Sequence, residues 1–403
     1  MCTDLLITSK AQDGENVVVN ARSQEFSAPL GYRLILRRAG DMVQVTRPST
    51  KSLGTGRPLA DPVLVDLCCS RFDYMGLVMT HEGVPVSTAL FDGMNAAGLS
   101  VGGLNAPSSK YQASDGETQE VFAGFFADWL LANYATCWEV KNAFSRGLLR
   151  VVATAGGPDP LENAKVVQRH VHIHFAVHDA GGNSLVIEFI DGEAVVTDNP
   201  IGVLTNLPVF SWHLTNLGMY GYLSNLSTHD AVGFGSVSYG PPGSFTPEPE
   251  SLAPPYRSAG IPGMGDGLAG IPGDFRPASR FVRTAYMKKF AVPPETTSEA
   301  VTQAFHLLNG VDIVKGASAE TGHDGTLEYD TTQCIMVKDL MNRVFYVRMY
   351  DSPMPYSISF ADFATFAPPH RENSQRGVQI TIPSAPLATP LRVEDVYRGM
   401  ELQ

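Results

Sequence analysis

The first two residues of the chain, Met1 and Cys2, could supply a nucleophile for covalent chemistry. Removal of an initiator methionine ahead of a small residue would leave Cys2 at the N-terminus, with a thiol and a free α-amine on the same carbon. The thiolate is the attacking form of cysteine, and an α-amine, whose pKa is about 7.7–8.0, can act as its base. A dipeptide alone is a weak signal and favours an ordinary cysteine at the start of a strand.

The residues that follow predict where the partners of Cys2 lie. Residues 2–22 contain two β-prone runs on either side of Asp13-Gly14, a pattern typical of a hairpin. The hairpin would return the chain so that Arg22 and Glu25 lie near Cys2. A guanidinium there favours the thiolate, and a carboxylate can hold the ammonium. The alternative is an Arg and a Glu on the surface after a strand.

The rest of the chain predicts strands, then helices, then strands again. The expected strands are residues 30–38, 75–80, a meander over 168–198, 327–337 and 343–349, with a turn at 91–99 entering a strand that ends at 104–107, and edge strands at 357–360 and 378–382. The expected helices are residues 117–135, about 138–146, part of 210–220, one opening at 279–283, and 298–308. This order favours an α+β fold with two packed sheets.

Length and composition bound the class of protein. The 403 residues, 44% hydrophobic and 17% charged, suffice for one large domain or two to three ordinary ones. Dense Pro and Gly at about 239–277 predict a long irregular excursion, not a boundary, so we expect a single domain over 1–403. The net charge of −12 argues against a nucleic-acid partner, and no run of about 18 apolar residues predicts a membrane span.

The cysteines indicate a reducing compartment. Their number is odd and their spacing irregular, which is not typical of a disulfide framework; they are Cys2, Cys68, Cys69, Cys137 and Cys334. No basic and apolar export signal precedes Cys2. We expect a cytoplasmic protein, or a periplasmic one if a signal peptide was removed from the sequence as given.

Two further patterns could bind a ligand. His170, His172 and His174 alternate and would share one strand face, but without a carboxylate or fourth ligand a polar strand face is favoured over a metal site. The glycine cluster at 263–267 has no preceding strand, following helix or Lys, so a phosphate loop is not expected. We expect no metal and no cofactor.

Five separated landmarks together resemble one family. In chain order they are Met1-Cys2-Thr3, Arg22-Ser23-Gln24-Glu25, Asp92-Gly93-Met94-Asn95 with Leu104-Asn105-Ala106-Pro107, Leu204-Thr205-Asn206-Leu207-Pro208, and Ser279-Arg280-Phe281-Val282-Arg283. From residue 2 to about 350 the chain resembles the choloylglycine hydrolase family, which includes bile salt hydrolases and penicillin V acylases. The resemblance implies a four-layer αββα sandwich of the N-terminal-nucleophile hydrolase type, no cofactor, and a homotetramer to which the segment after Asn206 contributes.

The resemblance also implies catalytic roles for individual residues. Cys2 would attack an amide carbonyl with its own α-amine as base, Arg22 would favour the thiolate, and Glu25, at a position that is often Asp, would hold the α-amine. Asn206 matches the oxyanion-hole Asn, Asn105 a position that assists it, and Arg280 an Arg that organises the charges around Cys2. The expected site residues are therefore Cys2, Arg22, Glu25, Asn105, Asn206 and Arg280.

The departures from the family pattern concern the substrate. The segment between Asn206 and Arg280 is longer than in typical bile salt hydrolases, and Ala106 stands where many carry Phe. We expect an apolar acyl pocket near Phe26 and Leu30 and a small-molecule N-acyl amide such as a conjugated bile salt or penicillin V. The alternatives are an N-acyl homoserine lactone or fatty-acyl amide hydrolase, the latter acid-ceramidase-like, and a non-catalytic small-molecule binding protein on the same scaffold.

Overall fold

The structure is a computed structural model of the chain. It describes residues 1–11, 13–27, 30–44, 67–81, 84–85, 89–115, 117–153, 172–225, 267–321, 325–362 and 378–382. Most of the expected excursion at 239–277 lies outside these residues, and the expectation of a single domain stays a prediction.

The first of two large antiparallel sheets contains the N-terminal hairpin. Its strand order is β15-β1-β2-β18-β19-β20. The bounds are Cys2–Lys10 for β1, Asn16–Phe26 for β2, Val203–Leu204 for β15, Thr331–Asp339 for β18, Val344–Met349 for β19 and Tyr356–Ser359 for β20. The two strands of the hairpin are the first two of the chain, and β18 returns from the C-terminal third to pair with β2.

The second sheet has the order β14-β13-β12-β9-β8-β6-β3-β21, with β7 paired to β6. Its strands are β3 Gly31–Arg37, β6 Tyr74–His81, β7 Val84–Pro85, β8 Asp92–Asn95, β9 Ser100–Asn105, β12 Ile173–His178, β13 Ser184–Ile190, β14 Glu193–Asp198 and β21 Val378–Ile382. Short pairs lie outside both sheets: β4 Met42–Gln44 with β5 Leu67–Cys69, β10 Gln119–Phe122 with β11 Leu149–Val152, and β16 Ala319–Thr321 with β17 Leu327–Tyr329.

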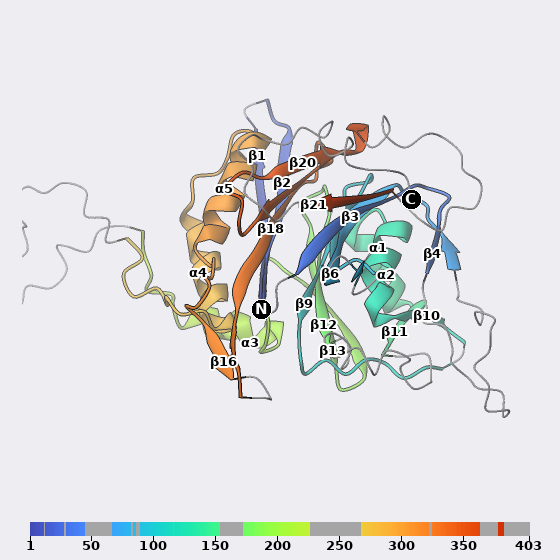
Figure 1. Cartoon of the computed structure of the whole chain (residues 1–403), viewed down its shortest axis with the longest axis horizontal. Helices are drawn as coiled ribbons and strands as arrows, with labels where there is room; N and C mark the ends of the chain where they lie inside the picture. The colour runs from blue at the N-terminus through green and yellow to red at the C-terminus, as the bar shows by residue number, and fades with distance from the viewer. Residues whose placement is uncertain are drawn as a thin grey trace, which may run out of the picture.

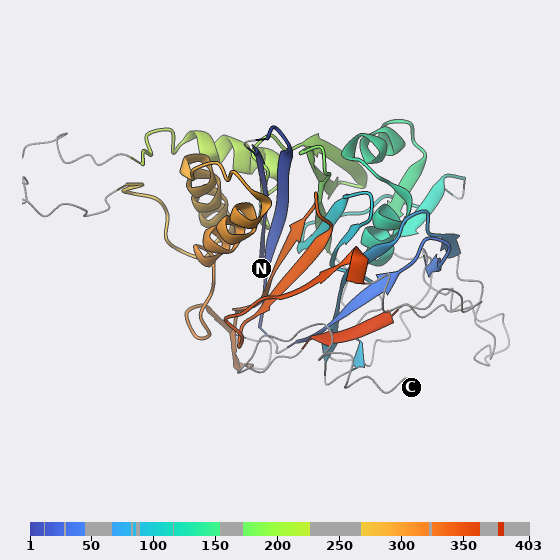
Figure 2. The same cartoon turned by 90° about the horizontal axis from the view of Figure 1, so that it is seen from above.

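Helices cover the outer face of each sheet, as Figures 1 and 2 show. On the first sheet they are α3 Phe210–Gly218, α4 Pro277–Phe290 and α5 Thr297–Asn309; on the second, η1 Ala123–Phe125, α1 Phe126–Asn133 and α2 Cys137–Ser145. Three apolar layers hold the arrangement together: one under α4 and α5, one under α1 and α2, and one between the sheets. The expected α+β fold of αββα type is confirmed.

The predicted hairpin is confirmed, and its register orients the site. Cys2 pairs with Gln24, and Asp4 pairs with Arg22. Paired side chains point to the same face of a sheet and successive ones alternate. The thiol of Cys2 and the guanidinium of Arg22 therefore point into the space between the sheets, whereas the odd-numbered Glu25 points toward the helices.

Two expected elements were wrong in part. The helix predicted at 117–135 begins at Phe126, because Gln119–Phe122 forms β10, parallel to β11. Val121 and Phe122 are buried in that pairing, so their apolar spacing reflects a strand followed by a helix. The turn predicted at 91–99 is also shorter, because Asp92–Asn95 forms β8 between β6 and β9. None of the helices in the described ranges is long and apolar enough to cross a membrane.

A buried carboxyl attaches α1 to the start of β8. Asp128 accepts hydrogen bonds from the main-chain N of Leu90 at 2.8 Å and from the Tyr74 hydroxyl at 3.2 Å. Burial raises the pKa of Asp128 to about 6. Between about pH 4 and 6 the folded carboxyl keeps a proton that the unfolded chain loses, so this group destabilises the fold as the pH rises.

We predict that Asp128→Asn gains stability relative to the wild type as the pH rises from 4 to 7. The gain should approach about 3 kcal/mol, since each unit of pKa shift corresponds to about 1.4 kcal/mol and Asn can keep both hydrogen bonds. Urea unfolding at the two pH values measures it. Asp191→Asn, at an exposed carboxylate, is the control; an equal pH dependence in both variants would contradict the assignment.

Candidate active site

The thiol of Cys2 lies against a buried guanidinium. Arg22 donates from Nη2 to Cys2 Sγ at 3.1 Å and to the Gly103 carbonyl at 2.5 Å. Cys2 is 5% exposed and Arg22 1%. Burial lowers the pKa of Arg22, but the charges of Cys2, Asp92 and Asp4 outweigh it and raise that pKa above its ordinary value. A positive charge therefore stands beside the sulfur, as the sequence predicted.

Neighbouring residues leave room for this guanidinium. The Phe91 ring lies beneath it, with 5.2 Å from Arg22 Cζ to the ring centroid. At Gly102 a Cβ would lie 3.0 Å from Arg22 Cδ and 3.2 Å from Asp92 Oδ2. A larger residue at position 102 would therefore require Arg22 or Asp92 to shift by a few tenths of an ångström.

On the helix side of β1, an Asn and an Arg hold the main chain of Cys2. The main-chain N of Cys2 donates to Asn206 Oδ1 at 2.8 Å. Arg280 of α4 donates to the Cys2 carbonyl at 2.5 Å, to Thr3 Oγ1 at 2.6 Å and to the same Asn206 Oδ1 at 2.7 Å. Its Nε donates to the Phe275 carbonyl at 2.9 Å. Arg280 thus ties β1, the segment after β15 and α4 together at Cys2.

Asn206 is itself fixed on two further sides. Its Nδ2 donates to the Asn105 carbonyl at 2.8 Å, and its own carbonyl lies 2.9 Å from His213 Nε2 in α3. Asn105 therefore contacts Asn206 through its main chain, while Asn105 as a whole is exposed. Burial lowers the pKa of His213, which favours the neutral ring. His213 was not predicted, because nothing in its sequence neighbourhood marks it.

Glu25 lies on the helix side of the hairpin, 1% exposed. Its Oε1 accepts a hydrogen bond from Thr332 Oγ1 at 3.2 Å, and its Oε2 is buried with no hydrogen-bond partner among the described residues. Burial raises its pKa, and the charges of Arg280 and the N-terminal amine oppose that shift. Met1 extends β1, with its N donating to the Glu25 carbonyl at 2.7 Å and its own carbonyl accepting from Glu25 N at 2.9 Å.

The structure thus brings all six predicted site residues together at the open end of the hairpin. Of the two predicted pocket residues, Leu30 is buried at 7% exposure and Phe26 is 37% exposed. In the alternating histidine pattern, His170 lies outside the described residues. His174 Nε2 lies 2.8 Å from the Thr205 carbonyl and His172 Nδ1 3.2 Å from that of Ser109, so both face main-chain oxygens.

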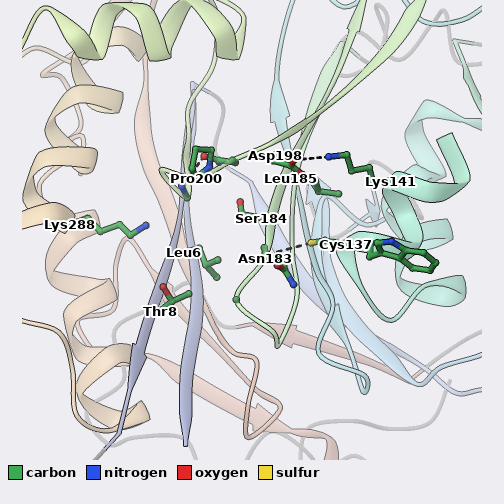
Figure 3. A pocket seen from close by; sticks show the side chains of 14 residues that line it. Leu6, Thr8, Cys137, Lys141, Asn183, Ser184, Leu185, Asp198, Pro200 and Lys288 are labelled. Atoms are coloured by element: carbon green, nitrogen blue, oxygen red, sulfur yellow. Dashed lines mark hydrogen bonds and ion pairs between the residues drawn. The ribbon is translucent and has the colours of Figure 1, made fainter. Parts of the chain in front are cut away.

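A cavity of about 440 Å³ lies elsewhere in the molecule (Figure 3). Leu6 and Thr8 of β1 line it, together with Lys288 of α4 and Cys137 of α2. Leu6 and Thr8 follow Cys2 along the strand and alternate with it on the same face. Cys2 does not line the cavity, so it lies farther along β1 and is separate from the thiol.

Two antiparallel sheets between layers of helices, with a buried cysteine at position 2, match the pattern of N-terminal-nucleophile hydrolases. The family model described as linear amide C–N hydrolases, choloylglycine hydrolase family, matches residues 2–253 and 257–363. The chain therefore belongs to the choloylglycine hydrolase family.

Curated relatives and solved structures agree with this family. The chain is 31% identical over 294 residues to a bile salt hydrolase/transferase of Clostridium perfringens, a match covering 70% of this chain and 75% of that protein. It is 31% identical over 291 residues to a bile salt hydrolase/transferase of Lactiplantibacillus plantarum, covering 72% and 78%.

The solved structures share the fold. A mutant conjugated bile acid hydrolase from Clostridium perfringens superposes with a TM-score of 0.67 at 24% identity, covering 97% of this chain and 100% of that one. A penicillin V acylase from Agrobacterium tumefaciens superposes with a TM-score of 0.63 at 17% identity, covering 94% and 90%.

We predict that Arg280→Lys destabilises the fold by about 3 kcal/mol. A lysine ammonium cannot reproduce a planar fork that serves four acceptors, so buried oxygens lose their donors. Urea unfolding measures the loss. Arg276→Lys is the matched control in the same segment, since the Arg276 side chain is 81% exposed and pairs with Asp274 at the surface; it should change stability by less than about 1 kcal/mol. Equal losses of unfolding free energy in the two variants would contradict the role of Arg280 as a hydrogen-bond donor to these four buried oxygens.

Proposed function

We propose that the chain is a cofactor-free cysteine amidase that hydrolyses the amide bond between an acyl group and a small amine, with Cys2 as its nucleophile. The observation that carries the proposal is that both the sulfur and the α-nitrogen of Cys2 are hydrogen-bonded to buried side chains. Sγ lies 3.1 Å from Arg22 Nη2, and the α-nitrogen lies 2.8 Å from Asn206 Oδ1. Membership of a family of linear amide C–N hydrolases supports it.

The α-nitrogen can act as a base only after Met1 is removed. As an amide it has no lone pair for a proton, whereas as an amine it could take the thiol proton. Removal of Met1 would also release the two main-chain hydrogen bonds to Glu25. Glu25 Oε2 is a candidate to bind the new ammonium, because this oxygen is buried without a hydrogen-bond partner among the described residues. A hydrogen bond from an ammonium would stabilise the ionised carboxylate.

The chemical steps then follow from this geometry. The thiolate attacks the carbonyl carbon, the C–S bond forms, and the carbonyl oxygen becomes an oxyanion. Asn206 Nδ2 donates one hydrogen to the Asn105 carbonyl and has a second hydrogen to offer that oxyanion. As the C–N bond breaks, the α-ammonium gives its proton to the leaving amine. Water then hydrolyses the thioester, with the α-amine again as base.

The acyl group is proposed to occupy apolar space between the sheets. Leu30, Tyr32 and Phe91 form part of the apolar layer there, and Met79 packs against it. Relatives named bile salt hydrolase/transferase and the fold shared with a penicillin V acylase favour conjugated bile salts or penicillin V. N-acyl homoserine lactones and fatty-acyl amides are the alternatives. A homotetramer and a cytoplasmic location stay predictions.

A second candidate function is a non-catalytic binding protein. Met1 exchanges hydrogen bonds with both main-chain groups of Glu25, and an N-terminus that kept its methionine would leave Cys2 without a free α-amine and hence without the proposed base. Intact mass separates the two functions: loss of Met1 supports the amidase, and retention supports the binding protein.

We predict that the processed protein releases amine from at least one of glycocholate, penicillin V and a long-chain acyl homoserine lactone. Cys2→Ala should abolish the release, because no other group supplies the nucleophile, and Cys2→Ser should lower it strongly. Amine detection with each substrate measures the rate and selects the substrate class. If protein with Met1 confirmed absent turns over none of the three, the amidase proposal fails.

We further predict that Asn206→Ala lowers kcat about 10²–10³-fold, the usual effect of losing one oxyanion donor. Asn105→Ala keeps the main-chain carbonyl that holds Asn206, so its loss should be smaller, within about tenfold. The two variants, assayed side by side at saturating substrate, separate the side chain of residue 105 from its main chain. A larger loss in Asn105→Ala would assign the oxyanion contact to that side chain instead.

A further inference from the structure

Behind Arg22, a second pair of buried charges continues away from the nucleophile. Asp92 of β8 lies 3.5 Å from Arg22 Nη1 through Oδ2, and its Oδ1 lies 2.5 Å from Lys338 Nζ of β18. Asp92 and Lys338 are both 0% exposed. Among the described residues, Asp92 is the only ion-pair partner recorded for Lys338. The row reads Lys338, Asp92, Arg22, Cys2, with alternating sign when the sulfur is a thiolate.

The position of Lys338 follows from strand register. In β18, Lys338 pairs with Asn20 and Met336 pairs with Arg22, so both share the inward face of the sheet with Arg22. Asp92 reaches the same space from the opposite sheet. The four groups of the row therefore come from β18, β8, β2 and β1, and they meet where the two sheets face each other.

A buried ion pair of this kind contributes little net free energy to the packing of two sheets. Moving two charges out of water costs several kcal/mol per ion, and apolar side chains of similar volume often serve equally well or better. The surrounding layer is apolar, with Met336 and Leu77 among its members. Because stability does not explain the Asp92–Lys338 pair, its effect on the neighbouring Arg22 is the more informative property.

We propose that Lys338 is a positioning residue that neutralises Asp92 and thereby leaves the charge of Arg22 available to the Cys2 thiolate. Without Lys338, Asp92 would have Arg22 as its one recorded cationic partner among the described residues. The negative charge of Asp92 would then compete with the thiolate for the guanidinium and weaken the interaction of Arg22 with the sulfur. With Lys338 present, Asp92 orients the guanidinium while the net charge of the Asp92–Lys338 pair is zero. This inference rests on the proposed role of Cys2 as nucleophile.

Other charged and titratable groups lie near the thiol or Arg22, and all of them are present in every variant of the test. Asp4, on the same strand face, binds His178 at 2.6 Å and Asn20 at 3.1 Å. The remaining groups are Glu25, Arg280, Tyr32, Cys334 and the N-terminal amine. Asp92 also interacts electrostatically with Asp4 and Cys334. A double-mutant cycle subtracts the effects that each single substitution has on such neighbours, so it isolates the coupling between positions 92 and 338.

The test is the pH dependence of Cys2 alkylation by iodoacetamide, followed by peptide mass spectrometry so that Cys2 is read apart from the other cysteines. Because only the thiolate reacts, the midpoint of the profile reports thiolate formation without any substrate. Lys338→Met should move the midpoint to higher pH by about one unit, the lower range for loss of one favourable charge interaction. Asp92→Asn combined with Lys338→Met removes both charges and should return the midpoint toward the wild type.

Three further variants make the result decisive. Lys338→Gln, which keeps a hydrogen-bond donor beside Asp92, should shift the midpoint in the same direction as Lys338→Met. Lys338→Arg, which keeps the charge, should leave it in place. Lys110→Met removes an exposed lysine paired to Asp191 at 2.8 Å and controls for net charge.

An unshifted midpoint in both neutral variants at 338, or a double variant that shows no return, would overturn the proposal. A shift in Lys110→Met of equal size would do the same. Amine release is assayed separately on the same variants. Failure of the proposed amidase function would remove amine release in the wild type but leave the alkylation profiles readable, so the two failures are distinguishable.

Discussion

The register of the first hairpin is the constraint on which the site depends. Pairing of Cys2 with Gln24 and of Asp4 with Arg22 sends the sulfur and the guanidinium to the inner face of the sheet. A slip of one residue would move every side chain to the opposite face. The Asp-Gly turn fixes the register locally, with Gly14 at φ +86°, and burial of β1 on both faces fixes it globally.

This register divides the surroundings of Cys2 into two environments. Toward the helices, Arg280 and Asn206 bind the main chain and the α-nitrogen through hydrogen bonds. Toward the second sheet, Arg22 meets the sulfur among buried charges. In the proposed mechanism one residue supplies both nucleophile and base, and its sulfur and α-nitrogen lie in different surroundings, each with its own partners. The fold supplies this separation because the first sheet is covered on both faces.

The sequence predicts those parts of the site that are local. Arg22 and Glu25 follow from one hairpin, and the helix expected to open at 279–283 is α4, which begins at Pro277. The contact between Asp92 and Lys338 could not be predicted in this way, since the two residues lie 246 positions apart and meet only when the two sheets pack. The error at 117–135 has a related cause: the apolar spacing of Val121 and Phe122 fits a helix, and the pairing of β10 with a strand almost thirty residues later decides otherwise.

The buried charges between the sheets nearly cancel. With a neutral thiol, the row from Lys338 to Cys2 carries two cations and one anion, all at most 5% exposed. Formation of a thiolate would bring the formal charge of the row to zero, with its four groups on β1, β2, β8 and β18. Because Gly102 leaves room for Arg22 and Asp92 orients it, this balance of charge depends on side chains in both sheets. In the proposed mechanism, the charges around the sulfur are therefore in place before the reaction begins.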